Sequence, residues 1–344
     1  MLSEDTTTLR ERLTAFARAF AGRRVLVVGD LIADQFVSGE IERVSREAPV
    51  MILRHERTET VPGGAANCAL NLATLGARAA IVGVAGDDEP GRALLERLSA
   101  AGVDCGGLLV SPRVRTTTKV RILAGHAHAP RQQVVRVDYE NGKLTDEKIL
   151  SELAGRVAEH FKASDAAVVS DYNYGVASPE TTARLREAAR EGAAPVLADS
   201  RYRLAEFAGF TSATPNEDEV EQAAGRRFSD SDVEELAAAG ESLRDRLAFR
   251  SLLITRGKHG MLLLEEGAAP LRLDAVGSHG AVDVTGAGDT VIATYALALA
   301  AGAGFADAAR LANHAGGIVV LKPGTATVSP QELLASLEQE CQDG

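Results

Sequence analysis

The chain has 344 residues, of which 45% are hydrophobic and 25% are charged; these values exclude a disordered or fibrous protein and fit one large α/β domain or two small ones. Acidic residues outnumber basic ones by 48 to 37, and the net charge of −11 argues against nucleic-acid or anionic-membrane binding through a basic patch. No signal peptide begins the chain, and its longest uncharged stretch, 290–306, falls short of a membrane span. Because the three cysteines are scattered and fit reduced thiols, we expect a cytoplasmic protein.

Apolar runs alternate with helical patterns along most of the chain. After an amphipathic N-terminal helix, the run 24–30 ends in Gly-Asp and is typical of a buried parallel strand. Similar runs recur at 79–84, 166–170, 195–199, 251–255 and 260–264. Helical patterns separate most of them, at 65–75, 91–101, 145–161, 178–191 and 231–248. This alternation predicts a doubly wound α/β sheet with helices on both faces.

Two segments, about 35–61 and 116–139, depart from this alternation because they have period-2 patterns and no helix between their strands. One strand face has Thr117, Lys119 and Arg121, and one face of the next strand has Gln132, Val134, Arg136 and Asp138, so both faces are mainly polar. We interpret both segments as a small β-layer projecting from the main sheet. Its polar face is either a solvated surface or a lid over a substrate. The pair His126 and His128 is interpreted as part of a surface loop rather than a metal site.

The strongest local signal is Asp-Val-Thr-Gly-Ala-Gly-Asp-Thr at 283–290, which follows a short predicted strand and opens an apolar helix at 291–301. Two glycines before a helix allow close backbone approach, and the first-turn N–H groups form an anion site. A dinucleotide fingerprint would need glycine where Val291 stands, and no P-loop sequence occurs. Asp289 either caps the helix or serves phosphoryl transfer.

Phosphoryl transfer suits an anion-binding turn beside a carboxylate better than dinucleotide binding does. In this interpretation the backbone amides of Gly286, Ala287 and Gly288 hold the transferring phosphoryl group. Asp289 then accepts the proton of the attacking hydroxyl.

Two upstream segments are candidates for sugar contacts. Gly63 and Gly64 precede a helix and would let a ligand touch the main chain, while Asn67 offers both a donor and an acceptor to sugar hydroxyls. Asp34, just past the first strand, could accept two hydroxyls. Each has a plain alternative, since a glycine pair is often only a turn and an aspartate in a loop is often a cap or a solvated residue.

A fourth candidate is the helix start Asn216-Glu-Asp-Glu219, which follows Thr-Pro. Acidic residues at this position satisfy the helix dipole, which is the structural interpretation. The functional one is Mg²⁺ held through water by Glu219, with Asn216 near nucleotide phosphates.

Taken in order, these motifs resemble the ribokinase-like (PfkB-type) carbohydrate kinase family over about residues 23–338. The matching features are Gly29-Asp30 through Asp34, Gly-Gly-x-x-Asn67, Asn216-x-x-Glu219, Thr255-Arg-Gly257 and Thr-Gly-Ala-Gly-Asp289. The resemblance implies a single domain, 1–344, with a three-layer α/β/α fold and a small β-sheet lid that often serves dimerisation. It also implies a homodimer that uses Mg²⁺ to transfer the ATP γ-phosphoryl group to a sugar hydroxyl.

Within that family the chain is most similar to the D-glycero-β-D-manno-heptose 7-phosphate kinases. The similar segments are 43–50, 61–67, 118–121, 132–138 and 324–330. The resemblance implies phosphorylation of the anomeric hydroxyl, with the substrate phosphate bound by basic lid residues among Lys119, Arg121 and Arg136. Some relatives carry an adenylyltransferase domain, whereas a kinase alone is expected here.

The resemblance also assigns the nucleotide and a monovalent cation. Thr255, Gly257, Gly260 and Asn313 would line the nucleoside side of ATP. A K⁺ site would be formed by Asp283 and Thr285, together with Gly324 and Thr327.

The chain departs from its relatives at several positions. Tyr174 stands where they tend to have Lys, Ser200-Arg201 stands in place of Pro-Lys, and the insertion 124–130 lengthens the lid. Kinases for another sugar, sugar phosphate or nucleoside remain alternatives. So does an ATP-dependent dehydratase of the same fold, although the pairing of Asp34 with Asn67 argues against it.

Overall fold

The computed structural model describes residues 6–125, 131–140, 142–191, 194–228, 232–277 and 280–339. The predicted loop histidines His126 and His128, most of the lid insertion and Cys341 lie outside these residues. Within them, none of the helices has both the length and the apolar character needed to cross a membrane.

In the described part of the chain, the main sheet has nine strands in the spatial order β13-β12-β11-β10-β9-β8-β1-β4-β5. These strands are β1 (Arg24–Gly29), β4 (Arg78–Gly86), β5 (Asp104–Ser111), β8 (Ala166–Asp171), β9 (Val196–Ser200), β10 (Ser212–Ala213), β11 (Ser251–Thr255), β12 (Met261–Glu265) and β13 (Leu271–Leu273). From β11 to β5 every neighbouring pair is parallel. The predicted parallel strand 260–264 is wrong in direction: β12 runs antiparallel to β11, because the short 3₁₀ turn Gly257–His259 between them leaves no room for a crossover.

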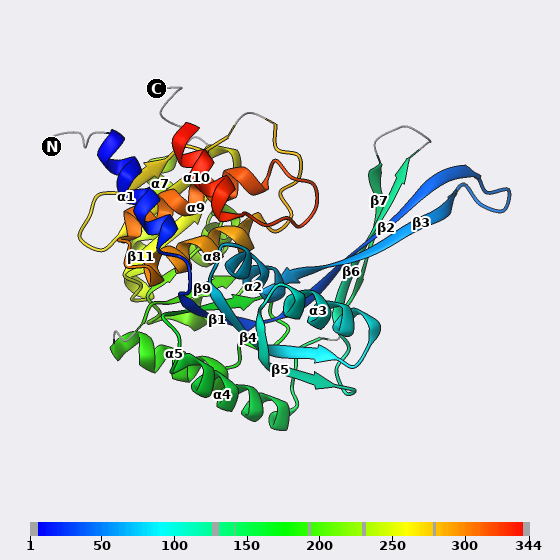
Figure 1. Ribbon diagram of the computed structural model, residues 1–344, viewed down its shortest axis with the longest axis horizontal. Helices are drawn as coiled ribbons and strands as arrows, with labels where there is room; N and C mark the ends of the chain where they lie inside the picture. Colours follow the sequence, from blue (N-terminus) through cyan, green and yellow to red (C-terminus); the bar gives the residue numbers. More distant parts are fainter. Residues whose placement is uncertain are drawn as a thin grey trace.

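Helices cover both faces of this sheet (Figure 1). One layer contains α1 (Thr6–Arg18), α2 (Ala65–Thr74), α3 (Glu89–Ala100), α8 (Ala287–Ala300), α9 (Phe305–Val319) and α10 (Pro330–Gln339); the other contains α4 (Glu147–Phe161), α5 (Pro179–Glu191), α6 (Glu217–Ala224) and α7 (Val233–Arg246). Strand β1 shows the cause, because Val25 and Val27 pack in the first core and Leu26 and Val28 in the second. The predicted three-layer α/β/α fold is confirmed.

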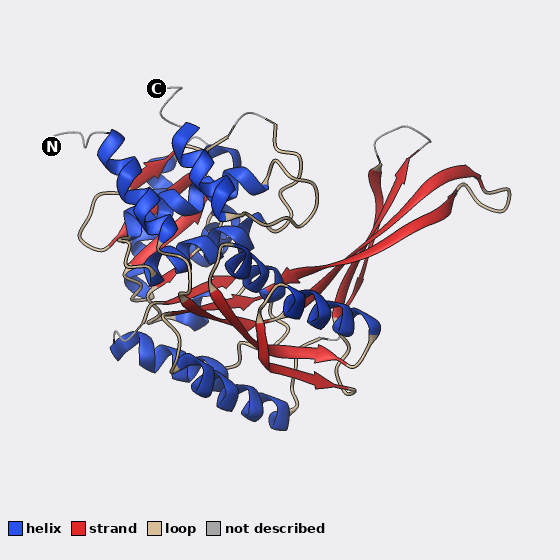
Figure 2. Cartoon of the chain, in the orientation of Figure 1, coloured by secondary structure: helices blue, strands red, loops and turns tan. Residues whose placement is uncertain are grey.

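A second sheet extends from the body like an arm, as Figures 1 and 2 show. It is built from β2 (Leu31–Val44), β3 (Met51–Gly64), β6 (Thr117–Gly125) and β7 (Gln132–Tyr139), in the order β3-β2-β6-β7. We call these four strands the lid. The predicted β-layer is therefore present, and its first two strands reach farther toward the body than expected. Asp34, predicted to lie in a loop, lies within β2 opposite Val61 and Lys119.

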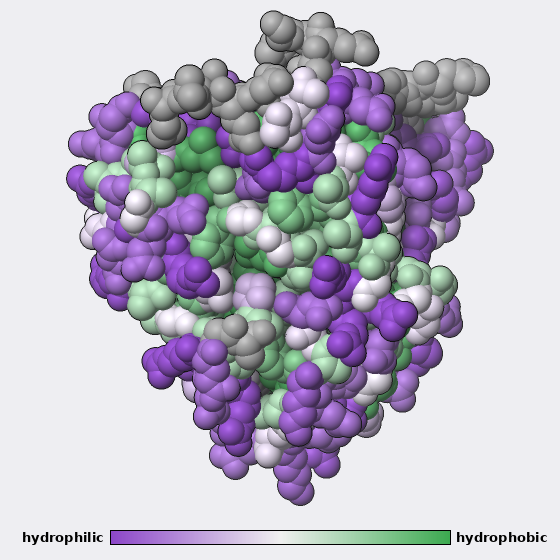
Figure 3. Space-filling view, turned by 60° about the vertical axis from the view of Figure 1, so that its left-hand side comes forward, coloured by the Kyte–Doolittle hydropathy of each residue, from purple (hydrophilic) through white to green (hydrophobic). Residues whose placement is uncertain are grey.

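The terminal helices α1 and α10 pack together on the same side of the body (Figure 1). An ion pair of 2.7 Å between Arg12 and Asp307 ties α1 to α9. In the face that Figure 3 shows, hydrophilic residues dominate the margins and apolar ones gather toward the middle. The lid therefore projects from a body whose sheet is covered by helices on both faces (Figure 1).

Candidate active site

The glycine-rich motif at 283–289 begins helix α8. The helix starts at Ala287, with Gly286 as its N-cap, so Gly288 and Asp289 lie in the first turn. The short strand predicted directly before the motif is absent from residues 280–286, which form a loop. Gly286 has a φ of 79°, and a Cβ there would come within 2.6 Å of the Asn67 side-chain nitrogen, so only glycine fits this contact.

Asp289 is 4% exposed, and its carboxylate does not cap the helix. Its Oδ2 instead accepts a hydrogen bond of 2.9 Å from the Asn67 side-chain amide, and its Oδ1 accepts one of 3.2 Å from the Tyr172 hydroxyl. These donors come from α2 and from the loop after β8. The capping alternative for Asp289 is therefore wrong: two distant segments hold the carboxylate in a fixed orientation.

Asn67, predicted to contact sugar hydroxyls, is fully buried and has hydrogen-bond partners within the protein. Its Nδ2 also lies 3.4 Å from the Gly286 carbonyl oxygen, and its Oδ1 accepts a hydrogen bond of 3.1 Å from Asn71. The neighbouring glycines make room inside the protein, since a Cβ on Gly63 would lie 2.3 Å from Asp34 Oδ2 and one on Gly64 would lie 3.2 Å from Tyr172 Cε2. The helix start that carries the Gly-Gly pair thus orients Asp289.

Buried carboxylates gather around this centre. Burial raises the pKa of Asp289 to about 7; the charges of Asp199 and Asp34 add to this rise, while the hydrogen bonds from Asn67 and Tyr172 oppose it. Burial also raises the pKa of Asp199 to about 7, with the Glu219 charge as a further cause. Carboxyl groups with pKa values of about 7 are partly ionised at neutral pH, and their ionised form can accept a proton or bind a cation.

Cations from the lid and from the segment after β9 approach this centre. Arg121 forms an ion pair with Asp34. Lys119 Nζ lies 5.4 Å, and Arg201 Cζ 5.6 Å, from the centroid of the Tyr172 ring. Arg136, in contrast, is half exposed and donates two hydrogen bonds, of 2.9 and 3.0 Å, to its neighbour Asp138. Lys119 and Arg201 therefore both lie close to the Tyr172 ring, next to Asp289.

The loop that carries Tyr172 is fixed by two buried carboxylates. Asp30, directly after β1, accepts hydrogen bonds from the backbone N–H groups of Tyr172 at 2.9 Å, Tyr174 at 3.0 Å and Val176 at 3.1 Å. Burial raises the pKa of Asp30 to about 6, and these amides oppose the rise. This arrangement explains the Gly-Asp pair after the first strand, which the sequence alone left without a role.

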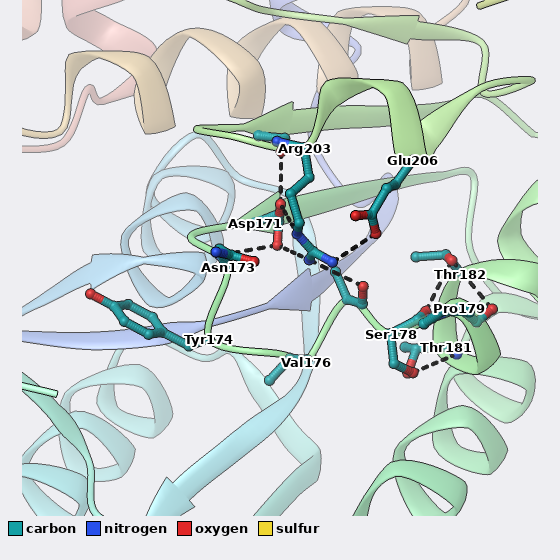
Figure 4. A network of polar contacts seen from close by, with 12 residues as sticks. Asp171, Asn173, Tyr174, Val176, Ser178, Pro179, Thr181, Thr182, Arg203 and Glu206 are labelled. Atoms are coloured by element: carbon teal, nitrogen blue, oxygen red, sulfur yellow. Dashed lines mark hydrogen bonds and ion pairs between the residues drawn. The ribbon is translucent and has the colours of Figure 1, made fainter. Parts of the chain in front are cut away.

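The second carboxylate is Asp171, the last residue of β8. Figure 4 shows the Arg203 guanidinium between Asp171 and Glu206, and the Asp171 carboxylate also accepts the Asn173 backbone N–H at 3.1 Å. The Asp171 side chain is fully buried and that of Arg203 is 13% exposed. The loop therefore starts from a buried ion pair.

The nucleotide-side candidates occupy neighbouring strand ends. Asn216 caps α6 in a reciprocal capping box: its side chain accepts the Glu219 N–H at 2.8 Å, and Glu219 accepts the Asn216 N–H at 2.9 Å. Asn216 also forms a parallel bridge with Thr255. The turn that follows is bracketed by Gly257 and Gly260, both with positive φ.

The candidates near the end of the chain are Asn313 and the loop around Asp283. Asn313 donates a hydrogen bond of 2.7 Å to the Asp274 carbonyl. Asp283 accepts the backbone N–H groups of Thr285 at 2.9 Å and Gly324 at 3.0 Å. Burial would raise the pKa of Asp283, but these hydrogen bonds hold it below its usual value.

The sequence matches the profile of the pfkB family carbohydrate kinases over residues 23–332. The chain belongs to this family. It is 43% identical over 317 residues to the bifunctional protein HldE of Pseudomonas aeruginosa, covering 92% of this chain and 64% of that protein. It is 40% identical over 332 residues to the bifunctional protein HldE of Geobacter sulfurreducens, covering 95% and 65%. The chain thus spans about two thirds of the length of these relatives.

Solved structures share the fold of this pfkB family chain. Arabidopsis thaliana ribokinase complexed with ribose and ATP superposes with a TM-score of 0.69 at 19% identity, covering 92% of this chain and 99% of that one. Escherichia coli phosphofructokinase-2 in complex with substrates and products gives a TM-score of 0.74 at 18% identity, with the same coverage. The predicted ribokinase-like fold and the carbohydrate kinase family are confirmed.

In this pfkB family chain, one centre brings together Asp289, Asn67, Asp34 and the lid cation Arg121, whereas Arg136 points its charge at Asp138. The motifs recognisable in the sequence assign no role to Tyr172, Asp199 or Thr325. Tyr172 and Asp199 lie at the ends of buried strands, a position that could have indicated them. Thr325 lies in the similar segment 324–330, but that similarity gives it no role.

Proposed function

We propose that the chain is an ATP-dependent sugar kinase that transfers the γ-phosphoryl group to a sugar hydroxyl. The observation that carries this proposal is the placement of Asp289, which lies in the first turn of α8 with its carboxylate turned away from the helix amides and held by Asn67 and Tyr172. Such a carboxylate is available to a hydroxyl next to the anion-binding end of the helix. Family membership supports the same reaction.

The reaction balances with Asp289 as the base. The sugar hydroxyl gives its proton to the Asp289 carboxylate while its oxygen forms a bond to the γ-phosphorus. The bond between the γ-phosphorus and the β–γ bridging oxygen breaks, and ADP leaves with that electron pair. The backbone N–H groups of the N-cap Gly286 and of Ala287 and Gly288 in the first turn would stabilise the charge on the transferring group, because they have no partner within the helix. The Ala287 N–H would have to exchange its present bond of 3.2 Å to the Val284 carbonyl. The proton then passes from Asp289 to solvent.

For the sugar we propose D-glycero-β-D-manno-heptose 7-phosphate, phosphorylated on its anomeric hydroxyl. The segments that resemble heptose 7-phosphate kinases support this choice, as do the cations near Asp34. Asp34 and the main chain at Gly63 and Gly64 would contact the sugar. Lys119, Arg121 and Arg201 would bind the phosphate, because charge-assisted hydrogen bonds to phosphate are stronger than neutral ones.

ATP would bind along Asn216, Glu219, Thr255, Gly257, Gly260 and Asn313. Mg²⁺ would bind beside Glu219, because the carboxylates of Glu219 and Asp199 offer oxygen ligands. Burial raises the pKa of both groups, and the charge of Glu219 raises that of Asp199 further. A cation between the two carboxylates would relieve this repulsion. No group of three or more His, Cys, Asp or Glu side chains suited to a metal occurs in the described ranges. That result fits a cation held through water and phosphate oxygens rather than by a protein cage. Bound Mg²⁺ would neutralise charge on the phosphates.

A K⁺ ion would bind near Asp283 and Thr285. Among the described residues, the buried Thr325 hydroxyl oxygen has no hydrogen-bond partner. Thr325 lies close to Gly286 and directly follows Gly324, whose backbone N–H donates to Asp283. An unsatisfied oxygen in the segment that bonds to Asp283 fits a monovalent cation that would stiffen the turn before α8. Equal rates in K⁺ and Na⁺ buffers would remove this cation from the proposal.

We further propose a homodimer formed through the lid. Val135, Val137 and Tyr139 of β7 and Met51 of β3 are 49%, 38%, 40% and 48% exposed, which is unusual for large apolar side chains on one small sheet. Burying them against the lid of a second copy would remove this area from water. The free thiols of Cys68 and Cys105 fit a cytoplasmic location, where thiols stay reduced.

The test is a screen of sugars and sugar phosphates with ATP, in which phosphorylated product and ADP are quantified together. The proposal expects one ADP per phosphorylated sugar, with heptose 7-phosphate the best substrate. ADP release with a dehydrated product would favour the dehydratase alternative. Turnover of free heptose at the same kcat/KM would refute the phosphate site but not the kinase.

A further inference from the structure

We propose that Tyr172 is a positioning residue for Asp289. The phenolic O–H of Tyr172 donates to one oxygen of the Asp289 carboxylate and favours the ionised form of that carboxylate, which accepts the substrate proton. The inference rests on the proposed kinase function, because it assigns Asp289 as the base. No motif of the sequence analysis includes Tyr172.

Within the described residues, each of the two carboxylate oxygens of Asp289 accepts a hydrogen bond from one side-chain donor. Asn67, on α2, donates to Oδ2 at 2.9 Å, and Tyr172, in the loop after β8, donates to Oδ1 at 3.2 Å. A carboxylate held at both oxygens cannot rotate about its χ2 angle without losing a bond. One donor alone would leave the other oxygen free to turn away from the substrate hydroxyl.

The position of the Tyr172 ring is itself over-determined. Its backbone N–H donates to the buried Asp30 carboxylate at 2.9 Å. Lys119 from the lid and Arg201 from the segment after β9 both lie within about 6 Å of the ring centroid, a distance at which cations are attracted to aromatic rings. The hydroxyl therefore has a defined place relative to Asp289.

Tyr172 acts toward Asp289 as a donor and not as a second base. Burial raises the pKa of its phenol well above the usual value, and the Asp289 charge adds to that rise, so the O–H keeps its proton over the working pH range. The hydrogen bond lowers the pKa of Asp289, in opposition to burial. The other ionisable or charged groups that bear on Asp289 are Asp199 on β9, Arg201 after it, Asp34 on β2 and Cys68 on α2.

Removing the hydroxyl should therefore make Asp289 harder to ionise. In Tyr172→Phe the ring and its cation contacts remain, while the charged carboxylate loses one donor. A hydrogen bond to a charged group corresponds to a shift of about one pH unit in the titration midpoint of Asp289, toward higher pH. A purely structural role for the ring would leave this midpoint unchanged.

The experiment is an infrared pH titration of the carboxyl stretch in the full chain without ligands, with Asp289→Asn in each background as the reference that isolates the Asp289 signal. The matched control is Tyr174→Phe, which removes a hydroxyl from the same loop. The Tyr174 hydroxyl donates to Glu140 and not to Asp289. We expect the midpoint to rise by about one unit in Tyr172→Phe and to stay in place in Tyr174→Phe. Equal midpoints in Tyr172→Phe and the wild type would overturn the proposal.

Kinetics separate this inference from the proposed function. With ATP and heptose 7-phosphate, the acidic limb of the kcat profile should move with the infrared midpoint, while KM for ATP stays unchanged. A shifted infrared midpoint in an enzyme that phosphorylates no sugar would refute the function and leave the positioning intact. If Tyr172→Phe fails to fold, 3,5-difluorotyrosine at position 172, a stronger donor, should lower the midpoint; an unchanged midpoint there would refute the inference.

Discussion

The side-chain nitrogen of Asn67 lies 2.9 Å from Oδ2 of Asp289, although 222 residues separate the two in sequence. The contact joins the first turns of two helices, α2 and α8, each of which follows a glycine. The glycine-containing starts of α2 and α8 therefore belong to the same site. The start of α8 supplies Asp289, the proposed base, and the start of α2 supplies Asn67, which orients it.

Replacing Asp289 by Asn should lower kcat by about 10²- to 10⁴-fold, because the variant keeps the shape of the side chain but cannot accept a proton. The anion-binding amides remain, so KM for ATP should change little and residual turnover should persist. Steady-state kinetics with ATP and heptose 7-phosphate measure both quantities. A kcat close to that of the wild type would remove Asp289 from the role of base.

The free energy of unfolding should fall as pH rises from about 5 to 8. Asp30, Asp199 and Asp289 have folded-state pKa values of about 6, 7 and 7, above those of the unfolded chain, so in this window the folded state binds protons that the unfolded state has already released. Asp88 and Asp283, whose pKa values are lowered, act with the opposite sign only at more acidic pH.

Asp289→Asn removes one of these groups and should raise Tm more at pH 8 than at pH 5.5, by about 3 °C or more. Thermal unfolding at the two pH values, without nucleotide or Mg²⁺, measures the difference. Asp307→Asn, whose carboxylate pairs with Arg12 far from the site, serves as the control. An equal Tm change at both pH values would contradict the predicted ionisation of buried Asp289.

Arg201→Ala should weaken kcat/KM for heptose 7-phosphate by roughly 10- to 150-fold, since a charge-assisted hydrogen bond to phosphate contributes about 1.5–3 kcal/mol. Use of an unphosphorylated sugar should barely change. Arg136→Ala should have the smaller effect, because Asp138 already occupies that guanidinium. The opposite ranking of the two variants would place the phosphate on the outer part of the lid.

Glu219→Gln should raise the Mg²⁺ concentration needed for half-maximal rate by about 10- to 100-fold, as expected when a residue that holds a metal through water loses its charge. The side-chain amide oxygen of the glutamine can still accept a hydrogen bond from the Asn216 N–H, so the capping box and the fold should persist. Mg²⁺ titrations at saturating ATP provide the measurement, and circular dichroism checks the helix content. An unchanged Mg²⁺ requirement would move the metal away from α6.

Local patterns in the sequence predicted much of this fold. The apolar runs of β1, β8 and β11 and the periodic helices between strands are recognisable because burial on two sheet faces imposes a local composition. The glycine-rich start of α8 was recognisable for a different local reason. A helix that begins against a ligand or a side chain needs residues without Cβ atoms.

Only the tertiary structure decided how the candidate residues meet. It turned β12 antiparallel, brought Asp34 into the lid sheet beside Arg121, and placed the Tyr172 hydroxyl on Asp289 across 117 residues of sequence. Such contacts depend on where crossover helices bring distant strand ends, and the raised pKa of Asp289 depends on burial, which exists only in the folded chain. Sequence spacing shows neither the contacts nor the burial, so local motifs indicated Asp34, Asn67 and Asp289 as candidates but not Tyr172 or Asp199, and not the hydrogen bonds or charge states of any of them.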